Sequence, residues 1–336
     1  MTRASLPKQL RKVADKQLLA TLESGLDKVE SQLIAAVSHT DPIAKVTTRH
    51  LIDAGGKRIR PTLVLLTSQL GEANSDEAIQ SAVVVELTHI GTLYHDDVMD
   101  DAPRRRGVES AHEIWGNNVA ILTGDLLFAR ASQLVSKLGQ KALTLQADTF
   151  ERLCLGQLNE TVGPQPGEDP ISHYLKVLAD KTGSLISASA ELGVIFSGAD
   201  QALREPVRRF GEAIGVAFQL IDDYIDLQSD GKVSGKTPGT DLRAGVATLP
   251  VLYLRQDAAT DLEAAKLVEI IDSGLEDEAK LEQLLVALRS HSATERTFTE
   301  AKRWASEAIA ALDGLPQGPV REALTNFAEA VIERDN

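Results

Sequence analysis

The chain has 336 residues, of which 43% are hydrophobic and 25% are charged, and its formal net charge is −14. This acidic balance argues against nucleic acid as a partner and against general attraction to anionic lipid. Cys154 is the only cysteine, so the chain can form neither an intrachain disulfide nor a cysteine-based metal site. The N-terminal residues show no secretory signal and no run of 18 apolar residues occurs, so we expect a cytoplasmic protein without stable membrane insertion.

Apolar residues recur at three- and four-residue spacing along most of the chain, which predicts helices. The segments with this pattern are 8–37, 75–100, 118–137, 141–162, 170–196, 201–228, 276–289 and 296–312. Ser75 and the pair Asp169-Pro170 are typical of helix starts. Because no convincing strand pattern interrupts the helices, we expect an all-α fold of ten or more helices. We expect a single domain over 1–336, with core motifs in 45–255 and C-terminal helices in 256–336.

The first basic motif is GGKRIRP, residues 55–61. The glycine pair frees the backbone for close approach to a ligand, and an arginine offers two parallel donors to phosphate oxygens. A helix end followed by a basic turn remains the alternative interpretation. The P-loop pattern is absent, so nucleotide hydrolysis has no support.

Two DDxxD motifs each end a mostly apolar helix segment. They comprise Asp96, Asp97 and Asp100 in the first and Asp222, Asp223 and Asp226 in the second. Residues four apart share a helix face, so two carboxylates can bind one hard cation or bridge two. A single DDxxD is compatible with a solvated acidic helix end, but two such ends in one chain indicate metal binding.

Magnesium is bound through few carboxylates together with substrate phosphates, so two acid clusters suggest a metal-bridged diphosphate. An EF-hand is excluded because neither cluster has the spaced loop with a distal Glu. Further basic positions occur at 104–106, at Lys181 next to Thr182, and at Lys236. His89 lies seven residues before Asp96 and therefore on nearly the same helix face; alone, it is compatible with a core histidine.

Taken together, these motifs resemble the trans-isoprenyl diphosphate synthase family of polyprenyl synthases. GGKRIRP, the first DDxxD followed by RRG, KTGSL, FQLIDDYIDL and GKTPGTDLRAG occur in that family's order. The resemblance covers residues 45–255. It implies an all-α bundle around a central cavity, usually homodimeric, that transfers prenyl groups head-to-tail with several Mg²⁺ ions. Isopentenyl diphosphate would attack the allylic cation left when the allylic diphosphate departs.

The resemblance also implies a role for each matching position. The metal ligands would be Asp96, Asp100 and Asp222, supported by Asp97, Asp223 and Asp226. Isopentenyl diphosphate would be held by Lys57, Arg60, His89 and Arg106. The allylic diphosphate would be held by Arg105, Lys181, Thr182, Gln219 and Lys236. Gln157 matches a polar position near the family's cavity. The chemistry needs charge stabilisation of the leaving group in a dry aliphatic cavity, and no protein nucleophile.

One position departs from the family pattern. The family often has a lysine after the glycine of GTDLRAG, where this chain has Val246. One diphosphate contact would then be missing, and Lys236 or Arg243 would have to compensate for it.

Product length depends, by the resemblance, on residues just before the first DDxxD, where short-chain members carry a bulky aromatic. Here these positions are Gly91 and Thr92. A glycine inside a helix costs about 1 kcal/mol relative to alanine, so it needs a reason. An open cavity floor is one reason and predicts a medium- or long-chain product, such as a quinone side chain. Close helix packing at Gly91 is the other.

Four alternatives remain. A geranylgeranyl-type synthase would make a shorter product. A noncatalytic subunit of a heteromeric synthase should have lost an acid cluster or GGKRIRP, and this chain keeps both. A terpene cyclase needs no site for isopentenyl diphosphate, so GGKRIRP and His89 argue against it. A purely structural scaffold leaves the paired acid clusters unexplained.

Overall fold

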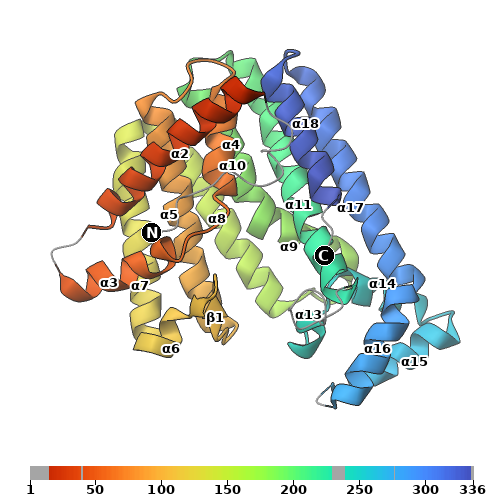
Figure 1. Cartoon of the computed structure of the whole chain (residues 1–336). Coiled ribbons are helices and arrows are strands. Elements are labelled where there is room, and N and C mark those ends of the chain that lie inside the picture. The colour runs from red at the N-terminus through yellow and green to blue at the C-terminus, as the bar shows by residue number, and fades with distance from the viewer. Residues whose placement is uncertain (1–14, 39–40, 229–238, 276, 334–336) are drawn as a thin grey trace. The chain divides into compact units, whose positions relative to one another are not determined.

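The computed structural model describes residues 15–38, 41–228, 239–275 and 277–333, and within them the all-α prediction is confirmed (Figure 1). The longer helices are α2 Lys16–Ala36, α3 Pro42–Asp53, α4 Ile59–Ser68, α5 Asp76–Met99, α7 Asn117–Val135, α8 Gln140–Val162, α9 Pro170–Leu178, α10 Ser184–Phe196, α11 Arg204–Gln228, α14 Leu249–Asp257, α15 Leu262–Asp272, α16 Glu278–Ser290, α17 Ser292–Ala311 and α18 Pro319–Ile332. The shorter elements are the hairpin of β1 Arg104–Arg105 and β2 Val108–Glu109, the helices α6 Ala111–Trp115 and α13 Thr240–Arg243, the 3-10 turns at 136–138, 201–203 and 312–314, and a π-helical turn, Ala179–Gly183.

The contacts divide the chain into two compact units. Unit 1 contains the described residues of Met1–Glu151, Leu185–Gly211 and Ala311–Asn326. Unit 2 contains those of Arg152–Ser184, Glu212–Ala310 and Phe327–Asn336. The first acid cluster and GGKRIRP therefore lie in unit 1, whereas the second acid cluster and Lys181 lie in unit 2.

Unit 1 is built around α5, which packs against α2, α4, α6 and α7. Side chains on every face of α5 are buried from Ala78 to Tyr94. A helix that is apolar all round needs such a central position, so its composition predicts its place. Ser75 begins the helix, where its hydroxyl accepts a hydrogen bond from the Ala78 N–H at 3.1 Å. The hairpin and α6 come directly after the C-terminal end of α5 (Figure 1).

The core of unit 2 is aliphatic. It joins the end of α11 to α13, α14, α15, α16 and the start of α17 through the buried residues Leu227, Leu242, Val251, Leu254, Leu267, Leu281, Leu284, Leu285, Leu288 and Ala293. The predicted helix start at Asp169-Pro170 is confirmed, because the Asp169 carboxylate accepts from the Ser172 N–H at 2.9 Å.

The periodic segments predicted from the sequence did not include α3, α4 and α14, whereas α15 and α18 lie where C-terminal helices were expected in 256–336. The sequence pattern extended the first helix to residue 8, which lies outside the described part of the chain. By length and composition, Asn117–Leu138 is the described segment that could cross a membrane, and a third of it is buried. Ile121 and Leu122 on this segment are largely exposed, so its apolar surface is not fully covered by the described part of the chain.

Candidate functional site

The glycine pair of GGKRIRP places Arg58 in an unusual backbone conformation. Gly55 and Gly56 have φ values of 87° and 152°, and Arg58 has φ 48° as the N-cap of α4. A left-handed arginine is uncommon and is held by its surroundings. Its side chain turns inward and is 3% exposed, whereas Lys57 is exposed.

Glu86 is the acid that receives these arginines, and sequence reasoning missed it. It lies on α5, 1% exposed, among the valines that precede the acid cluster. Its Oε1 accepts from Arg58 Nη1 at 2.8 Å and lies 3.5 Å from Arg106 Nη2. Glu30 on α2 pairs with the other side of Arg58, with Oε1 2.6 Å from Nε. The signal available in the sequence was a glutamate inside the apolar run VVVEL.

Arg60 and Arg106 share this region but are less completely neutralised. Arg106, at φ 53° in the hairpin turn, donates to the carbonyls of Leu51 and Gly55. Burial lowers the pKa of Arg106, partly opposed by Glu86. Burial also lowers the pKa of Arg60 to about 10, with Glu86 opposing and Arg106 adding to the decrease. The Arg60 Nε is buried and has no hydrogen-bond partner among the described residues. Such a donor is costly unless an acceptor binds, so this cluster is suited to an anion.

His89 lies within the field of the same arginines. Burial lowers its pKa well below the ordinary value, and the charges of Arg60 and Arg106 lower it further. His89 is therefore neutral at physiological pH and can donate one ring N–H. The structure thus brings Arg60, His89 and Arg106 into one electrostatic cluster, while their role toward a diphosphate stays a prediction.

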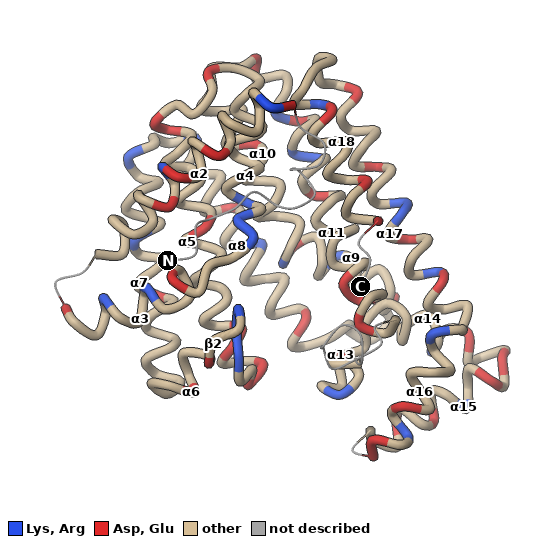
Figure 2. Tube along the Cα trace, viewed as in Figure 1, with Lys and Arg blue, Asp and Glu red and all other residues tan. Residues whose placement is uncertain are grey.

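The first acid cluster ends α5. Asp100 is the C-cap, and its N–H donates to the Asp96 carbonyl at 2.8 Å, so the helical spacing of the motif is retained. Asp97 points differently: its side chain is 1% exposed, and Oδ1 accepts from Arg105 Nε at 2.6 Å. Burial raises the pKa of Asp97 and Arg105 opposes that shift. The acidic end of α5 is followed by the basic residues of the hairpin (Figure 2).

Gly91 is a close-packing position in the structure. A Cβ at Gly91 would lie 3.0 Å from the ring of Phe128 on α7 and 3.3 Å from the Gly124 carbonyl. Phe128 in turn contacts the Phe150 ring at a centroid distance of 4.6 Å. The room beside Gly91 is therefore filled by Phe128, which favours the packing alternative over an open floor at that residue. The Thr92 hydroxyl bonds back to the His89 carbonyl at 2.8 Å.

In unit 2 the three aspartates of the second cluster have different surroundings. Asp223 is buried at 2% exposure, and its Oδ2 accepts from the Tyr174 hydroxyl at 2.6 Å. Burial raises the pKa of Asp223 to about 8, although hydrogen bonds from Tyr174 and Gln219 lower it. The raised pKa favours the protonated carboxyl in metal-free protein, so a metal ion that binds Asp223 would release a proton.

Asp226 caps the next described element. Its Oδ1 accepts from the Thr240 N–H at 3.1 Å and its Oδ2 from the Asp241 N–H at 3.2 Å, so it organises the start of α13 (Figure 1). Asp241 is a further acid that sequence reasoning passed over inside GTDLRAG. Burial, together with the charges of Asp226 and Asp222, raises its pKa to about 6. Asp241 therefore belongs electrostatically to the second cluster.

Lys181 and Thr182 lie in the π-helical turn between α9 and α10. Such turns carry one extra residue per turn and are frequent at functional sites. α8 approaches this turn through Gly156, where a Cβ would lie 2.7 Å from the Lys181 nitrogen. Arg152 fixes the turn from the same helix, with Nε 2.8 Å from Asp180 Oδ1. The Lys181 ammonium pairs with Glu160.

The remaining predicted residues have varied positions. Lys236 lies outside the described residues. Gln219 is half-buried beside Asp223, and the Gln157 Oε1 is buried with no hydrogen-bond partner in the described part of the chain. Arg243 pairs with Glu278, its Nη2 2.8 Å from Oε2, so a compensating role toward diphosphate would require this exposed pair to open. Val246 is 43% exposed.

Comparison with known proteins identifies relatives over nearly the whole chain. Residues 41–288 match the family model for polyprenyl synthetases. The chain is 41% identical to nonaprenyl diphosphate synthase of Mycobacterium tuberculosis over 96% of each chain. It is 34% identical to heptaprenyl diphosphate synthase component 2 of Geobacillus stearothermophilus, covering 95% of this chain and 99% of the relative.

A solved structure shares the same fold. The geranylgeranyl pyrophosphate synthase of Corynebacterium glutamicum, crystallised with calcium and isoprenyl diphosphate, superposes with a TM-score of 0.86. It is 40% identical and the match covers 96% of this chain and 98% of that one. The nonaprenyl and geranylgeranyl synthases are thus similar to this chain to nearly the same degree, although their names imply products of different length.

The Glu86 carboxylate should contribute strongly to stability. We expect Glu86→Gln to lower the free energy of unfolding by about 3 kcal/mol, because it leaves buried arginine charge uncompensated. Urea unfolding followed by circular dichroism measures this. Glu30→Gln is the matched control, since Glu30 pairs with the same arginine but is more exposed (side chain 22% against 2%). A loss for Glu86→Gln no larger than for Glu30→Gln would contradict the assignment.

The raised pKa of Asp223 predicts a pH effect in metal-free protein. Its folded-state pKa of about 8 lies above its ordinary value near 4, so the folded state holds an extra proton between these limits. The stability contributed by this group therefore falls as pH rises through that window and levels off above it. We expect Asp223→Asn to gain stability relative to wild type from pH 5 to pH 8. Urea unfolding in EDTA tests this, with exposed Asp148→Asn as control; a pH-independent difference would refute it.

Proposed function

This chain belongs to the polyprenyl synthetase family and is a prenyltransferase that condenses isopentenyl diphosphate, and we propose that its product is an all-trans polyprenyl diphosphate of medium or long chain, made with Mg²⁺. The allylic co-substrate carries its own diphosphate as leaving group. A quinone side chain is the use we favour for such a product.

The arginine cluster of unit 1 carries this proposal. Arg58 is neutralised by Glu86 and Glu30, whereas Arg60 keeps a lowered pKa and a buried Nε that no described residue satisfies. The cluster therefore holds positive charge that an added anion would neutralise. A diphosphate supplies several acceptor oxygens and more than one negative charge, which suits two arginines and a neutral histidine donor. We assign isopentenyl diphosphate to Arg60, Arg106 and His89, with exposed Lys57 closing over it.

The acid clusters suit the divalent metal that the family uses to bind diphosphate. Asp96 and Asp100 retain the helical spacing that lets two carboxylates reach one hard cation. Asp222 is the aspartate we favour in the second cluster, because the buried Asp223 accepts from Tyr174 and both Asp226 oxygens accept from backbone N–H groups. When bound, Mg²⁺ stabilises the charge that develops on the departing diphosphate.

The other basic residues would hold the allylic diphosphate. Lys181, Thr182, Arg105, Gln219 and Lys236 are the candidates. Lys181 is paired with Glu160, and Arg105 with Asp97. Binding of a diphosphate must replace these pairs with charge-assisted bonds of comparable strength. The released diphosphate is the base that we propose for the proton, which leaves the isopentenyl carbon next to the new cationic centre as the double bond forms.

Product length is the part on which the relatives divide. We propose that the growing chain runs along α5 from the acid cluster toward the N-terminal end of the helix and passes Gly91, where the Phe128 ring is the first barrier and the Phe150 ring packs behind it. The nonaprenyl relative supports a long product. The geranylgeranyl-type relative supports the shorter alternative.

A homodimer is the assembly we propose. The exposed apolar side chains Ile121, Leu122 and Leu126 lie on α7, and they form the kind of surface that a second copy would cover. The alternative is a heteromeric synthase, which the name of the heptaprenyl relative, component 2, suggests for that protein. Sedimentation equilibrium of the purified chain separates monomer from dimer, and a monomer at micromolar concentration would contradict the proposal.

Activity of the purified chain alone tests the function. We expect condensation of isopentenyl diphosphate with a short allylic diphosphate in Mg²⁺ and none in EDTA. Asp222→Asn should reduce kcat by about 100-fold or more, because charge stabilisation at the leaving group is lost. Asp148→Asn, an exposed aspartate on α8, is the control. Activity that requires a second protein would support the regulatory or heteromeric alternative instead.

Phe128→Ala should lengthen the main product by one or more isoprene units, because it removes the ring that fills the space beside Gly91. Gly91→Phe in that background should shorten the product again, since the new ring occupies the vacated space. Ser132→Ala, an exposed change on the same helix, is the control. Chromatography of the dephosphorylated products measures length, and identical distributions for wild type and Phe128→Ala would rule out this barrier.

A further inference from the structure

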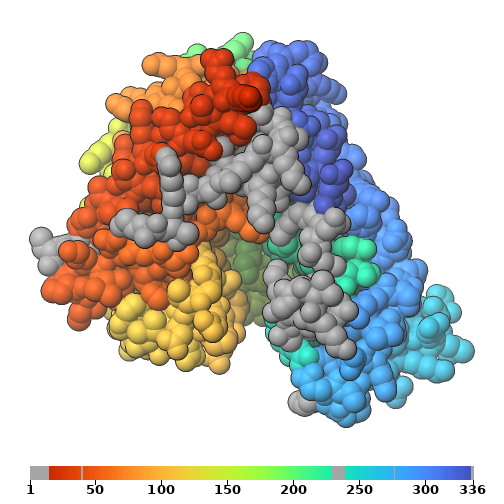
Figure 3. Space-filling model, in the orientation of Figure 1, coloured from red at the N-terminus to blue at the C-terminus, as the bar shows by residue number. Residues whose placement is uncertain are grey.

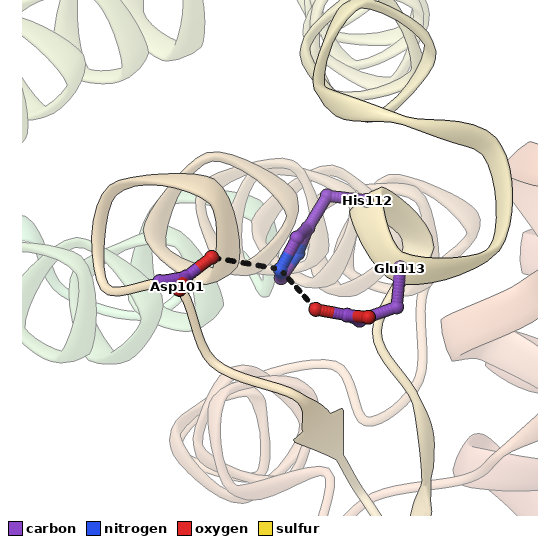
Figure 4. Close-up of side chains that lie close together, drawn as sticks. All are labelled: Asp101, His112 and Glu113. Atoms are coloured by element: carbon purple, nitrogen blue, oxygen red, sulfur yellow. Dashed lines mark ion pairs between the residues drawn. The ribbon is translucent and has the colours of Figure 1, made fainter.

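A second group of metal-type ligands lies just beyond the first acid cluster. Asp101 stands in the turn after α5, with φ 48°, and His112 and Glu113 lie on α6 (Figure 4). The His112 Nε2 is 3.7 Å from Asp101 Oδ1 and 3.4 Å from Glu113 Oε1. One donor atom from each residue lies within 4.8 Å of the others. We call these three residues the exit triad.

The histidine of the exit triad is buried but unsatisfied. Its side chain is 4% exposed, and neither ring nitrogen has a hydrogen-bond partner within the described ranges of the chain. A buried polar group without a partner costs about 1–3 kcal/mol. The carboxylates stand slightly too far from the ring for good hydrogen bonds. Two ligands held about 2.0–2.1 Å from a tetrahedral metal lie about 3.4 Å apart. The His112 Nε2 is 3.4 and 3.7 Å from the two carboxylates, and the two carboxylates lie within 4.8 Å of each other, so a small closure would complete this geometry.

The donor set also has the charge and softness of a transition-metal site. Two carboxylates and a neutral imidazole carry two negative charges, which a divalent ion neutralises. Imidazole suits zinc and its neighbours, whereas magnesium prefers oxygen ligands and keeps its waters. Asp101 and Glu113 are exposed, so an ion can reach the triad from solvent. Figure 3 shows the segment around residues 100–115 at the surface of unit 1.

We propose that Asp101, His112 and Glu113 bind one divalent transition-metal ion of the zinc class, with water as the fourth ligand. The hairpin that carries Arg105 and Arg106 is the stretch of chain between the two ligand-bearing segments. The ion therefore links Asp101, which precedes the hairpin, to His112 and Glu113, which follow it. Its effect is to fix the position of both arginines, and it is separate from the metal that accompanies diphosphate.

Cobalt substitution tests the proposal without any reference to activity. Metal-free full-length protein is saturated with Mg²⁺ to occupy the aspartate clusters and is then titrated with Co²⁺. We expect one Co²⁺ per chain with the strong visible absorption of a four-coordinate nitrogen- and oxygen-ligated ion. Zn²⁺ should displace it stoichiometrically.

Three variants assign the site. Asp101→Asn and His112→Gln should each weaken Co²⁺ binding at least tenfold and abolish the absorption. Asp101 is exposed, so its variant tests the site even if the His112 variant fails to fold. Asp125→Asn is the matched control: Asp125 also faces a histidine, with 3.5 Å between Oδ1 and His95 Nε2, but that nitrogen bonds the Ile121 carbonyl. Absence of the four-coordinate spectrum, or unchanged binding in Asp101→Asn, overturns the proposal and leaves the triad as an ion pair.

Discussion

A single buried carboxylate organises unit 1. Glu86 lies in the middle of an otherwise apolar helix, and its charge is what allows Arg58, Arg60 and Arg106 to lie close together away from water. Three guanidinium groups without it would repel one another in a medium that screens poorly. Because Arg58 takes most of the neutralisation, the other two arginines remain oriented and only partly compensated. The cluster can therefore bind an anion because Glu86 neutralises Arg58 more fully than it neutralises Arg60 and Arg106.

The second acid cluster also contains like charges with unequal surroundings, but here the charges are negative. Three aspartates that look equivalent in the motif have three different environments. Burial raises the pKa of Asp223, which accepts from Tyr174; Asp226 accepts from two backbone N–H groups; and Asp222 is the ligand we favour. Asp241 adds a fourth carboxyl with a raised pKa. Crowding of these carboxyls raises the pKa values of some of them, so they tend to hold protons in metal-free protein. Because a carboxyl must lose its proton to bind a metal ion, metal binding here is coupled to proton release.

The sequence predicted the features that are local to a helix and missed those that depend on tertiary partners. The apolar pattern of 75–100, its start at Ser75 and its acidic end all arise from spacing along one element, and they agree with α5. The pairing of Arg58 with Glu30 joins residues 28 positions apart, and the cap from Asp226 reaches 14 positions ahead. Nothing in a linear pattern selects such partners. Gly91 illustrates this limit: its place inside a predicted helix marked the glycine as unusual, but the sequence did not show that the Phe128 ring lies against it.

The π-helical turn at Ala179–Gly183 has an unexpected consequence for how this protein can change. α9, the turn and α10 run on continuously from Pro170 to Phe196, so the turn is an insertion of one residue into a long helix. Deleting that residue would give a more regular helix with better hydrogen bonds, while rotating the residues before it by about 100° relative to those after it. Lys181 would then leave its place beside Glu160. The irregular turn is therefore what keeps Lys181 in position, and a variant with a shorter, more regular helix would lose that position.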